Sequence, residues 1–249
     1  MEIQKVIIVI TGGASGMGAA CAAHFAKLGM RVVVWDRTPV YVTHIELAVP
    51  CDVSNAQSVE HALMLTKQQV GIPRILINCA GIAPAKRMVG KNGPQPLQDF
   101  QQVIDINLVG TFNVMRLVVA AMLEYKLTAE DTERGVIINT ASIAAFEGQI
   151  GQMAYSASKG GIVSMTLPAA RELAQHAIRV NTIAPGLIAT PMLLGMPDDV
   201  QIQLSKSVTF PQRFGKPEEF AQLAQQLIEN EFMNGEVIRF DGALRMQAK

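Results

Sequence analysis

Short runs of β-branched residues alternate with longer amphipathic runs along the chain, and this alternation limits the possible folds more than any other feature. The short runs have the length of strands and the longer runs that of helices, which is the sequence form of repeated βαβ units. Such units build a parallel sheet covered by helices. The candidate strands are residues 6–10, 31–35, 45–49, 74–78, 135–140, 179–183 and 236–240. We predict an α/β fold, a Rossmann-type doubly wound parallel sheet of about seven strands, in a single domain over residues 1–249.

The longer runs predict five helices between these strands. Several of them are opened by Pro, Ser or Asn and closed by Gly, as helix capping requires. The candidate helices are residues 16–28, 55–70, 97–124, 153–175 and 217–230. Two long connections, residues 83–96 and 187–212, are predicted to be functional or mobile loops. The stretch 38–43 is short for a helical crossover between parallel strands, so we expect a turn there.

Composition excludes several classes of protein. Hydrophobic residues make up 49% of the chain and charged residues 17%, whereas a disordered chain has the opposite balance. The 21 basic and 21 acidic residues cancel, so the chain lacks the basic excess of nucleic-acid binders and of polybasic membrane binders. No uninterrupted apolar run approaches the roughly 18 residues of a membrane span. We therefore expect a small-molecule substrate, no nucleic acid and no membrane span.

The three cysteines bear on the compartment. Cys21, Cys51 and Cys79 are odd in number, widely spaced and set in apolar stretches. Neither a disulfide framework nor a metal site follows from such spacing, so we predict buried free thiols and no metal. The apolar start of the chain runs into a glycine-rich turn rather than a cleavage site. The expected location is a reducing compartment: the cytoplasm, or the mitochondrial matrix if the source is a eukaryote.

A glycine-rich turn lies between the first candidate strand and the first helix, at residues 11–18. Glycines there permit positive φ and let the backbone approach a pyrophosphate, which the N–H groups of the first helical turn can bind. Asp36 ends the second strand and can accept hydrogen bonds from the ribose hydroxyls of an adenosine. It would also repel a 2′-phosphate, so NAD is favoured over NADP. Arg37 could instead bind a phosphate or remain a solvated cation.

Asn107, Ser142, Tyr155 and Lys159 form the candidate catalytic set. Ser142 follows a strand whose carboxyl end opens onto the ligand crevice of such a sheet. Tyr155 and Lys159 are four residues apart in a helical pattern and therefore share a face. An ammonium near a phenol favours the phenolate, so we expect Lys159 to lower the pKa of Tyr155 and make it a general base. An ordinary surface pair is the alternative interpretation of this spacing.

Taken in order, these motifs resemble those of the short-chain dehydrogenase/reductase family over essentially the whole chain. The motifs are the glycine turn, Asp36, residues 78–81, Asn107, Ser142, residues 155–159 and residues 185–186. The resemblance implies that Tyr155 is the general acid/base, Ser142 polarises the substrate oxygen and Lys159 binds the nicotinamide ribose. Asn107 would lie at a helix irregularity and help to hold a proton-relaying water. The implied cofactor contacts are Gly12, Ser15, Gly16, Met17, Gly18, Asp36, Asp52, Val53, Cys79, Ala80, Gly81, Tyr155, Lys159, Pro185, Gly186, Ile188 and Thr190.

A narrower resemblance joins residues 141–152, 234–239 and 241–246 to the type II 3-hydroxyacyl-CoA dehydrogenases, a group also described as 17β-hydroxysteroid dehydrogenases. That group carries an insertion where residues 83–96 lie. It implies NAD-dependent oxidation of 3-hydroxyacyl-CoA to 3-ketoacyl-CoA. Gln152 matches a residue near the substrate, beside Ser142 and Tyr155, although a loop residue bonded to backbone is an equal interpretation.

Residues 187–212 are rich in Met and Leu, and we expect an apolar lid over an acyl chain there. In the insertion, Lys86, Arg87 and Lys91 either meet the CoA phosphates or remain solvated. The apolar residues of the long central helix, Val114, Leu117, Val118, Ala121 and Met122, indicate a second apolar face and, with the family, a homotetramer.

Three other functions are alternatives to the oxidation of 3-hydroxyacyl-CoA. A hydroxysteroid or other secondary-alcohol dehydrogenase would differ only in the pocket lining. A ketoacyl reductase using NADPH is disfavoured by Asp36. A non-catalytic cofactor-binding scaffold would have no chemical need for Ser142, Tyr155 and Lys159.

Overall fold

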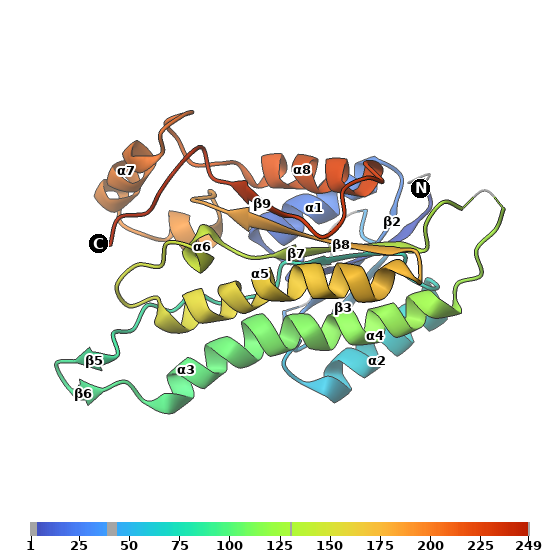
Figure 1. Cartoon of the computed structure of the whole chain (residues 1–249), viewed down its shortest axis with the longest axis horizontal. Coiled ribbons are helices and arrows are strands. Elements are labelled where there is room, and N and C mark those ends of the chain that lie inside the picture. Colours follow the sequence, from blue (N-terminus) through green and yellow to red (C-terminus); the bar gives the residue numbers. More distant parts are fainter. Residues whose placement is uncertain (1–3, 39–43, 130, 249) are drawn as a thin grey trace.

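The predicted strands form one parallel sheet in the computed structural model, which describes residues 4–38, 44–129 and 131–248 (Figure 1). The sheet has seven strands in the order β3-β2-β1-β4-β7-β8-β9, and every pairing in it is parallel. The strands are β1 Ile7–Thr11, β2 Arg31–Asp36, β3 Leu47–Pro50, β4 Ile75–Asn78, β7 Gly135–Thr140, β8 Ile178–Pro185 and β9 Val237–Phe240. The predicted fold class is therefore confirmed. The third strand begins two residues later than predicted.

The chain reverses direction across the sheet between β1 and β4. From β1 it builds outward through β2 and β3, and then returns to pair β4 with the other edge of β1. In such sheets the crevice for ligands opens beyond the carboxyl ends of the strands at this switch point. The ends of β1, β2, β4 and β7 all meet there.

Helices cover both faces of the sheet, and two cores result (Figure 1). On one face α1 Gly16–Lys27 packs with α8 Pro217–Glu229, and Phe25 and Phe220 are fully buried between them and the sheet. The opposite face carries α2 Ala56–Gln69, α4 Gly110–Glu124 and α5 Met153–Ala174. Strand residues alternate between the two cores, since Ile8 and Ile10 belong to the first and Val9 to the second.

The long helix predicted over residues 97–124 has an interruption. It consists of α3 Leu97–Ile104, a π-helical turn η1 Asp105–Val109 and α4. Asn107 lies in the π turn, at the irregularity that the family resemblance implied. Of the residues taken to mark a partner-facing side, Val114, Val118, Ala121 and Met122 are buried in the protein's own core, and Leu117 packs against it. That part of the prediction was wrong, because this side of the helix faces the sheet.

By its length and composition alone, the helix Leu97–Glu124 is also long and apolar enough to cross a membrane. Polar residues and Gly110 interrupt its apolar residues, so no continuous apolar run marks this helix in the sequence. Half of its apolar window is buried inside the protein, as in a core helix. The other described helices do not meet this criterion.

The two long loops contain regular structure that periodicity did not reveal. Residues 83–96 include a small hairpin of β5 Val89–Gly90 and β6 Gly93–Pro94. Residues 187–212 include α6 Pro191–Leu194 and α7 Asp198–Ser207. A short 3₁₀ helix, η2 Ile143–Ala145, follows β7. The turn expected at residues 38–43 falls largely on residues 39–43, which lie outside the described residues.

Candidate active site

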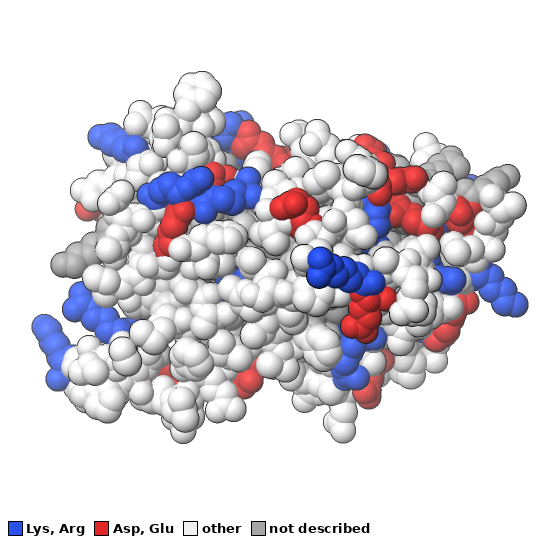
Figure 2. All heavy atoms as spheres, in the orientation of Figure 1, with Lys and Arg blue, Asp and Glu red and all other residues white. Residues whose placement is uncertain are grey.

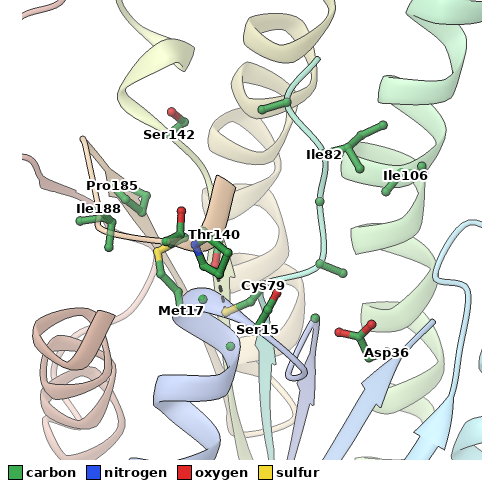
Figure 3. Close-up of a pocket in the computed structure, with 18 of the residues that line it drawn as sticks. Ser15, Met17, Asp36, Cys79, Ile82, Ile106, Thr140, Ser142, Pro185 and Ile188 are labelled. Atoms are coloured by element: carbon green, nitrogen blue, oxygen red, sulfur yellow. Dashed lines mark hydrogen bonds between the residues drawn. The ribbon is translucent and has the colours of Figure 1, made fainter. Parts of the chain in front are cut away.

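A cleft of about 430 Å³ opens at the switch point, which is within the usual size range of small-molecule sites (Figure 3). Every residue predicted to contact the cofactor lines it. These residues come from the glycine turn, from α5 and from the ends of β2, β3, β4 and β8 with the segments that follow them: Gly12, Ser15, Gly16, Met17, Gly18, Asp36, Asp52, Val53, Cys79, Ala80, Gly81, Tyr155, Lys159, Pro185, Gly186, Ile188 and Thr190. The fold thus brings together positions that are scattered over most of the sequence.

The glycine turn is shaped for close backbone contact. Gly12 has φ +66°, and a Cβ on it would lie 2.8 Å from the Cα of Ala80. A Cβ on Gly18 would strike the carbonyl oxygen of Gly12. The helix α1 starts at Gly16, and its first turn borders the cleft. Free N–H groups at a helix N-terminus favour an anion, so this cradle fits the pyrophosphate of a dinucleotide.

Asp36 holds the turn and faces the cleft at the same time. Its Oδ2 accepts a hydrogen bond from the N–H of Ala14 at 3.1 Å, and its Oδ1 accepts one from the N–H of Thr38 at 3.1 Å. The carboxylate borders the cleft beyond the end of β2 (Figure 3). It can accept hydroxyl donors from a ribose there. The exposed Arg37 also borders the cleft.

Asp52 and Val53 line the part of the cleft that is predicted to take the adenine. The carboxylate of Asp52 accepts hydrogen bonds from the N–H and hydroxyl of Ser54, at 2.9 and 2.6 Å. Asn113 of α4 donates to the carbonyl of Val53 at 2.9 Å. Gly110 lets Val53 approach the helix, because a Cβ on Gly110 would lie 2.7 Å from a Val53 methyl group. The hydrogen bonds from Ser54 and Asn113, with the packing of Val53 on Gly110, therefore fix this wall of the cleft.

Ser142, Tyr155 and Lys159 converge at the other end of the cleft. Ser142 caps η2 by accepting a hydrogen bond from the N–H of Ala144 at 3.1 Å, and its side chain hydrogen bonds with Tyr155. The Nζ of Lys159 donates to the carbonyl of Thr140 at 2.7 Å and lies 5.8 Å from the centre of the Tyr155 ring. The site therefore combines the hydroxyls of Ser142 and Tyr155 with the buried ammonium of Lys159.

The electrostatics of this group differ from the expectation. Burial raises the pKa of Tyr155 above its ordinary value, and the hydrogen bond with Ser142 opposes the rise. Burial also lowers the pKa of Lys159 to about 8, which weakens it as a source of positive charge at alkaline pH. The predicted lowering of the Tyr155 pKa is therefore not seen in this arrangement, because the loss of solvent around the phenol is the largest influence on that pKa. The effect of Lys159 on Tyr155 stays a prediction.

Asn107 supports the site without lining the cleft. Its Nδ2 donates to the carbonyl of Ile82 at 2.9 Å and to the hydroxyl of Ser158 at 3.0 Å, while its Oδ1 accepts from the N–H of Ile82 at 2.8 Å. The Thr111 hydroxyl donates to its carbonyl at 2.7 Å. Asn107 thus ties the cleft wall after β4 to α5, and its part in a water relay stays a prediction.

Gln152 lies in the turn before α5 and is not among the cleft-lining residues. Its Oε1 accepts a hydrogen bond from the N–H of Gln149 at 3.0 Å. These contacts agree with the interpretation of Gln152 as a turn residue bonded to backbone. A contact with substrate stays a prediction.

Several cleft residues were not predicted from the sequence. They flank the recognised motifs and are mostly apolar, so they carry no chemical signal of their own: Trp35, Cys51, Ile82, Ala83, Ile106, Thr140 and Ala141. Pro191, Leu193 and Met196 also line the cleft, and they belong to the segment predicted to form a lid. Of the residues that were not predicted, Thr140 has the clearest role in the site, because its carbonyl accepts a hydrogen bond from Lys159. Its place two residues before Ser142, at the end of a strand, could have signalled it. No group of metal-ligating side chains occurs among the described residues.

A dinucleotide cradle joined to a serine, tyrosine and lysine at one sheet edge defines an oxidoreductase site of the nicotinamide-dependent kind. Comparison with known proteins agrees. A family model described as short chain dehydrogenase matches residues 6–200, and the chain belongs to that family.

Relatives match the chain over nearly its full length. It is 50% identical to the 3-hydroxyacyl-CoA dehydrogenase type-2 of Rattus norvegicus, covering 99% of this chain and 97% of the relative. The protein of the same name from Drosophila melanogaster is 49% identical, with 98% and 99% covered. The crystal structure of 3-hydroxyacyl-CoA dehydrogenase type-2 from Mycobacterium avium superposes with a TM-score of 0.89 at 37% identity, over 98% and 97% of the two chains.

Proposed function

We propose that this oxidoreductase oxidises the hydroxyl of a 3-hydroxyacyl-CoA to a ketone and uses NAD⁺ as the hydride acceptor. The observation that carries the cofactor choice is the Asp36 carboxylate in the cleft. Like charges brought together in a binding site cost several kcal/mol, so a 2′-phosphate beside this carboxylate would bind poorly. The relatives named 3-hydroxyacyl-CoA dehydrogenase type-2 support the substrate class.

The chain's own residues would move one proton. NAD⁺, when bound, supplies the hydride acceptor. The Ser142 hydroxyl holds the substrate oxygen beside Tyr155, with which it shares a hydrogen bond. Tyr155, as phenolate, accepts the substrate proton, and Lys159 orients the ribose from its anchor on the carbonyl of Thr140. Ser142 and Lys159 are buried and Tyr155 is half-buried, which limits the contact of these groups with water.

The rim of the cleft fits an acyl thioester. Leu193 and Met196, from the segment proposed as a lid, line it with apolar atoms. In the insertion, the ammonium of Lys86 pairs with Asp99 at 2.7 Å, whereas Arg87 and Lys91 are exposed. We propose Arg87 and Lys91 as the cations nearest to the CoA phosphates. Charge reversal at both, with Lys86 as the paired control, should raise the KM for acyl-CoA and leave that for NAD⁺ unchanged.

A substrate and cofactor panel tests the proposal. The enzyme is assayed on a 3-hydroxyacyl-CoA, a hydroxysteroid and a simple secondary alcohol, with NAD⁺ and with NADP⁺, and Tyr155→Phe serves as the inactive control. Preference for the thioester with NAD⁺ supports the proposal. Preference for the steroid would indicate the alternative dehydrogenase, and preference for NADP⁺ would indicate a reductase. No turnover by the wild-type enzyme would leave the scaffold role.

We also propose a homotetramer in a reducing compartment. Exposed apolar side chains lie on the outer side of α3, η1, α4 and α5, namely Leu97, Val109, Phe112, Leu123, Met153 and Leu167. Figure 2 shows this side as largely uncharged. Burial of such a face by a second copy is favourable, since large exposed apolar patches mark interaction surfaces. Solution scattering at micromolar concentration tests the assembly, and a monomer there would contradict it.

A further inference from the structure

The C-terminal segment, residues 241–248, follows β9 and lies outside the two cores that flank the sheet. In Figure 1 the C-terminus lies at the same end of the protein as the start of α5 and the hairpin of β5 and β6. Leu244 is buried, whereas the other residues of the segment are half-buried or exposed. Polar contacts therefore have to hold most of this segment in place.

A cluster of four charged side chains joins the C-terminal segment to residues 146–152, the loop between η2 and α5. The carboxylate of Glu147 accepts hydrogen bonds from the guanidinium of Arg239, at 2.9 and 3.2 Å. Arg239 also donates to Asp241 at 2.8 Å, and Arg245 lies 3.3 Å from both carboxylates. Each charge in the cluster thus meets two charges of opposite sign. The planar fork of Arg239 fixes the angles between the two carboxylates, which a lysine ammonium would not do.

Backbone groups add to the contacts between the C-terminal segment and the 146–152 loop. The N–H of Met246 donates to the carboxylate of Glu147 at 3.1 Å. The N–H of Ile150 donates to the carbonyl of Ala248, also at 3.1 Å. The same short segment therefore holds the loop near its start and near its middle.

The C-terminal segment also contacts the base of the predicted lid. The N–H of Phe210 donates to the carbonyl of Gly242 at 3.2 Å. The hydroxyl of Thr209 donates to the carbonyl of Ala243, also at 3.2 Å. The segment therefore connects the base of the lid with the 146–152 loop, two parts of the chain that are distant in sequence.

The 146–152 loop connects the two hydroxyls of the proposed proton transfer. Ser142 directly precedes η2, and Tyr155 lies in the first turn of α5, so the loop influences how these two side chains lie relative to each other. A displacement of reacting groups by about 1 Å can lower a rate by about 100-fold. The contacts that hold the loop therefore bear on the rate of the chemical step.

We propose that the C-terminal segment positions Ser142 and Tyr155 for alcohol oxidation, and that Arg239 is the positioning residue on which this depends. Arg239 does not line the cleft, so it acts through Glu147 and the loop. The inference rests on the proposed function, because it assigns these contacts a role in that reaction. Loss of the guanidinium should slow the chemical step and leave the binding of NAD⁺ unchanged.

Kinetics of Arg239→Gln and Arg239→Lys test the proposal, with Arg31→Gln as the matched control. Arg31 forms an exposed pair with Glu46 at the start of β2, at the opposite ends of the strands from the cleft. We expect kcat to fall about 10-fold in Arg239→Gln and by less in Arg239→Lys. The KM for NAD⁺ should be unchanged in both, and the control should equal wild type.

A single turnover, with enzyme and NAD⁺ in excess over the alcohol, separates positioning from loss of folded protein. Its rate constant reports the chemical step and does not depend on the fraction of active enzyme, so it should also fall about 10-fold in Arg239→Gln. The alcohol is the one that the wild-type enzyme oxidises fastest in the substrate panel. Failure of the 3-hydroxyacyl-CoA proposal therefore leaves this test in place.

Hydrogen exchange measured by mass spectrometry tests the contact without turnover. Arg239→Gln should raise exchange in peptides from the 146–152 loop and leave those from β1 and β4 unchanged. Met246→Pro removes the N–H that Glu147 accepts and keeps every charge. It should give the same changes at smaller size, and it replaces Arg239→Gln if that variant does not fold. Unchanged exchange in the loop, or a single-turnover rate constant equal to that of wild type, would overturn the proposal.

Discussion

Lys159 should make the folded protein less stable at neutral pH than an apolar side chain would. It is 5% exposed, and burial lowers its pKa from 10.5 to about 8. Since each pKa unit corresponds to about 1.4 kcal/mol, keeping the ammonium charged at pH 7 costs about 3 kcal/mol. Lys159→Met keeps the aliphatic stem and removes the charge, but the carbonyl of Thr140 loses its donor, worth about 1 kcal/mol. We expect a net gain of about 2 kcal/mol together with loss of activity.

The free energy of unfolding gained by Lys159→Met should decrease as pH rises. Above pH 8 the folded lysine releases its proton while the unfolded one still holds it. The unfolded state then binds more protons, so the free energy of unfolding of the wild-type protein rises from pH 8 toward pH 10. The advantage of Lys159→Met is therefore largest below pH 8 and fades by pH 10.

Urea unfolding of both proteins at pH 7 and pH 10 measures this difference. Lys67→Met is the matched control, because Lys67 forms an exposed pair with Glu124 and should change stability by less than about 1 kcal/mol. A less stable Lys159→Met protein at pH 7, or a gain of equal size at both pH values, would refute the reasoning.

Other contacts lead to further predictions. Because burial raises the pKa of Tyr155, alcohol oxidation should accelerate as pH rises above neutral, and Ser142→Ala should move the midpoint of the kcat/KM profile to higher pH, since it removes the opposing hydrogen bond. Glu133→Gln should lower the free energy of unfolding by about 3–5 kcal/mol, because it leaves Arg179 charged and buried. Glu147→Gln should lower kcat by about 10-fold with little change in KM, as Glu147 anchors the loop between Ser142 and Tyr155, the proposed catalytic pair, to the C-terminal segment.

Each of these three predictions has its own control or contradicting result. Glu219→Gln is the control for Glu133→Gln, because both carboxylates meet an arginine at 2.6 Å but the pair with Arg213 is exposed. A loss of stability equal in the two variants would contradict the role of burial. An unmoved pH midpoint in Ser142→Ala, or a loss confined to KM in Glu147→Gln, would contradict the other two.

Much of the architecture could be predicted from sequence because it depends on local pattern. Strands buried on both faces must be continuous apolar runs, so their positions were evident, and the glycine turn marked the first crossover. The glycines and Asp36 among the predicted cofactor contacts could be recognised because backbone approach demands glycine and ribose recognition favours a carboxylate, whereas the others followed from the family resemblance; all of them line the cleft. Each of these constraints acts on a single position, so it can be recognised in the sequence without knowledge of distant contacts.

The remaining features depend on contacts between distant residues. The direction of the Tyr155 pKa shift follows from how completely the phenol is buried, which spacing along a helix does not reveal. The anchoring of Lys159 on the carbonyl of Thr140 likewise arises only when α5 is packed against β7. The hairpin of residues 89–94 has too few apolar residues to show a period.

We propose that the chain oxidises a 3-hydroxyacyl-CoA with NAD⁺ through Tyr155. The most direct test is the kcat/KM for 3-hydroxybutyryl-CoA oxidation measured with NAD⁺ and with NADP⁺. We predict a preference for NAD⁺ of at least about 100-fold, as several kcal/mol of charge repulsion at Asp36 implies, and a fall of at least about 100-fold in Tyr155→Phe. Equal use of the two cofactors, or full activity in Tyr155→Phe, would contradict it.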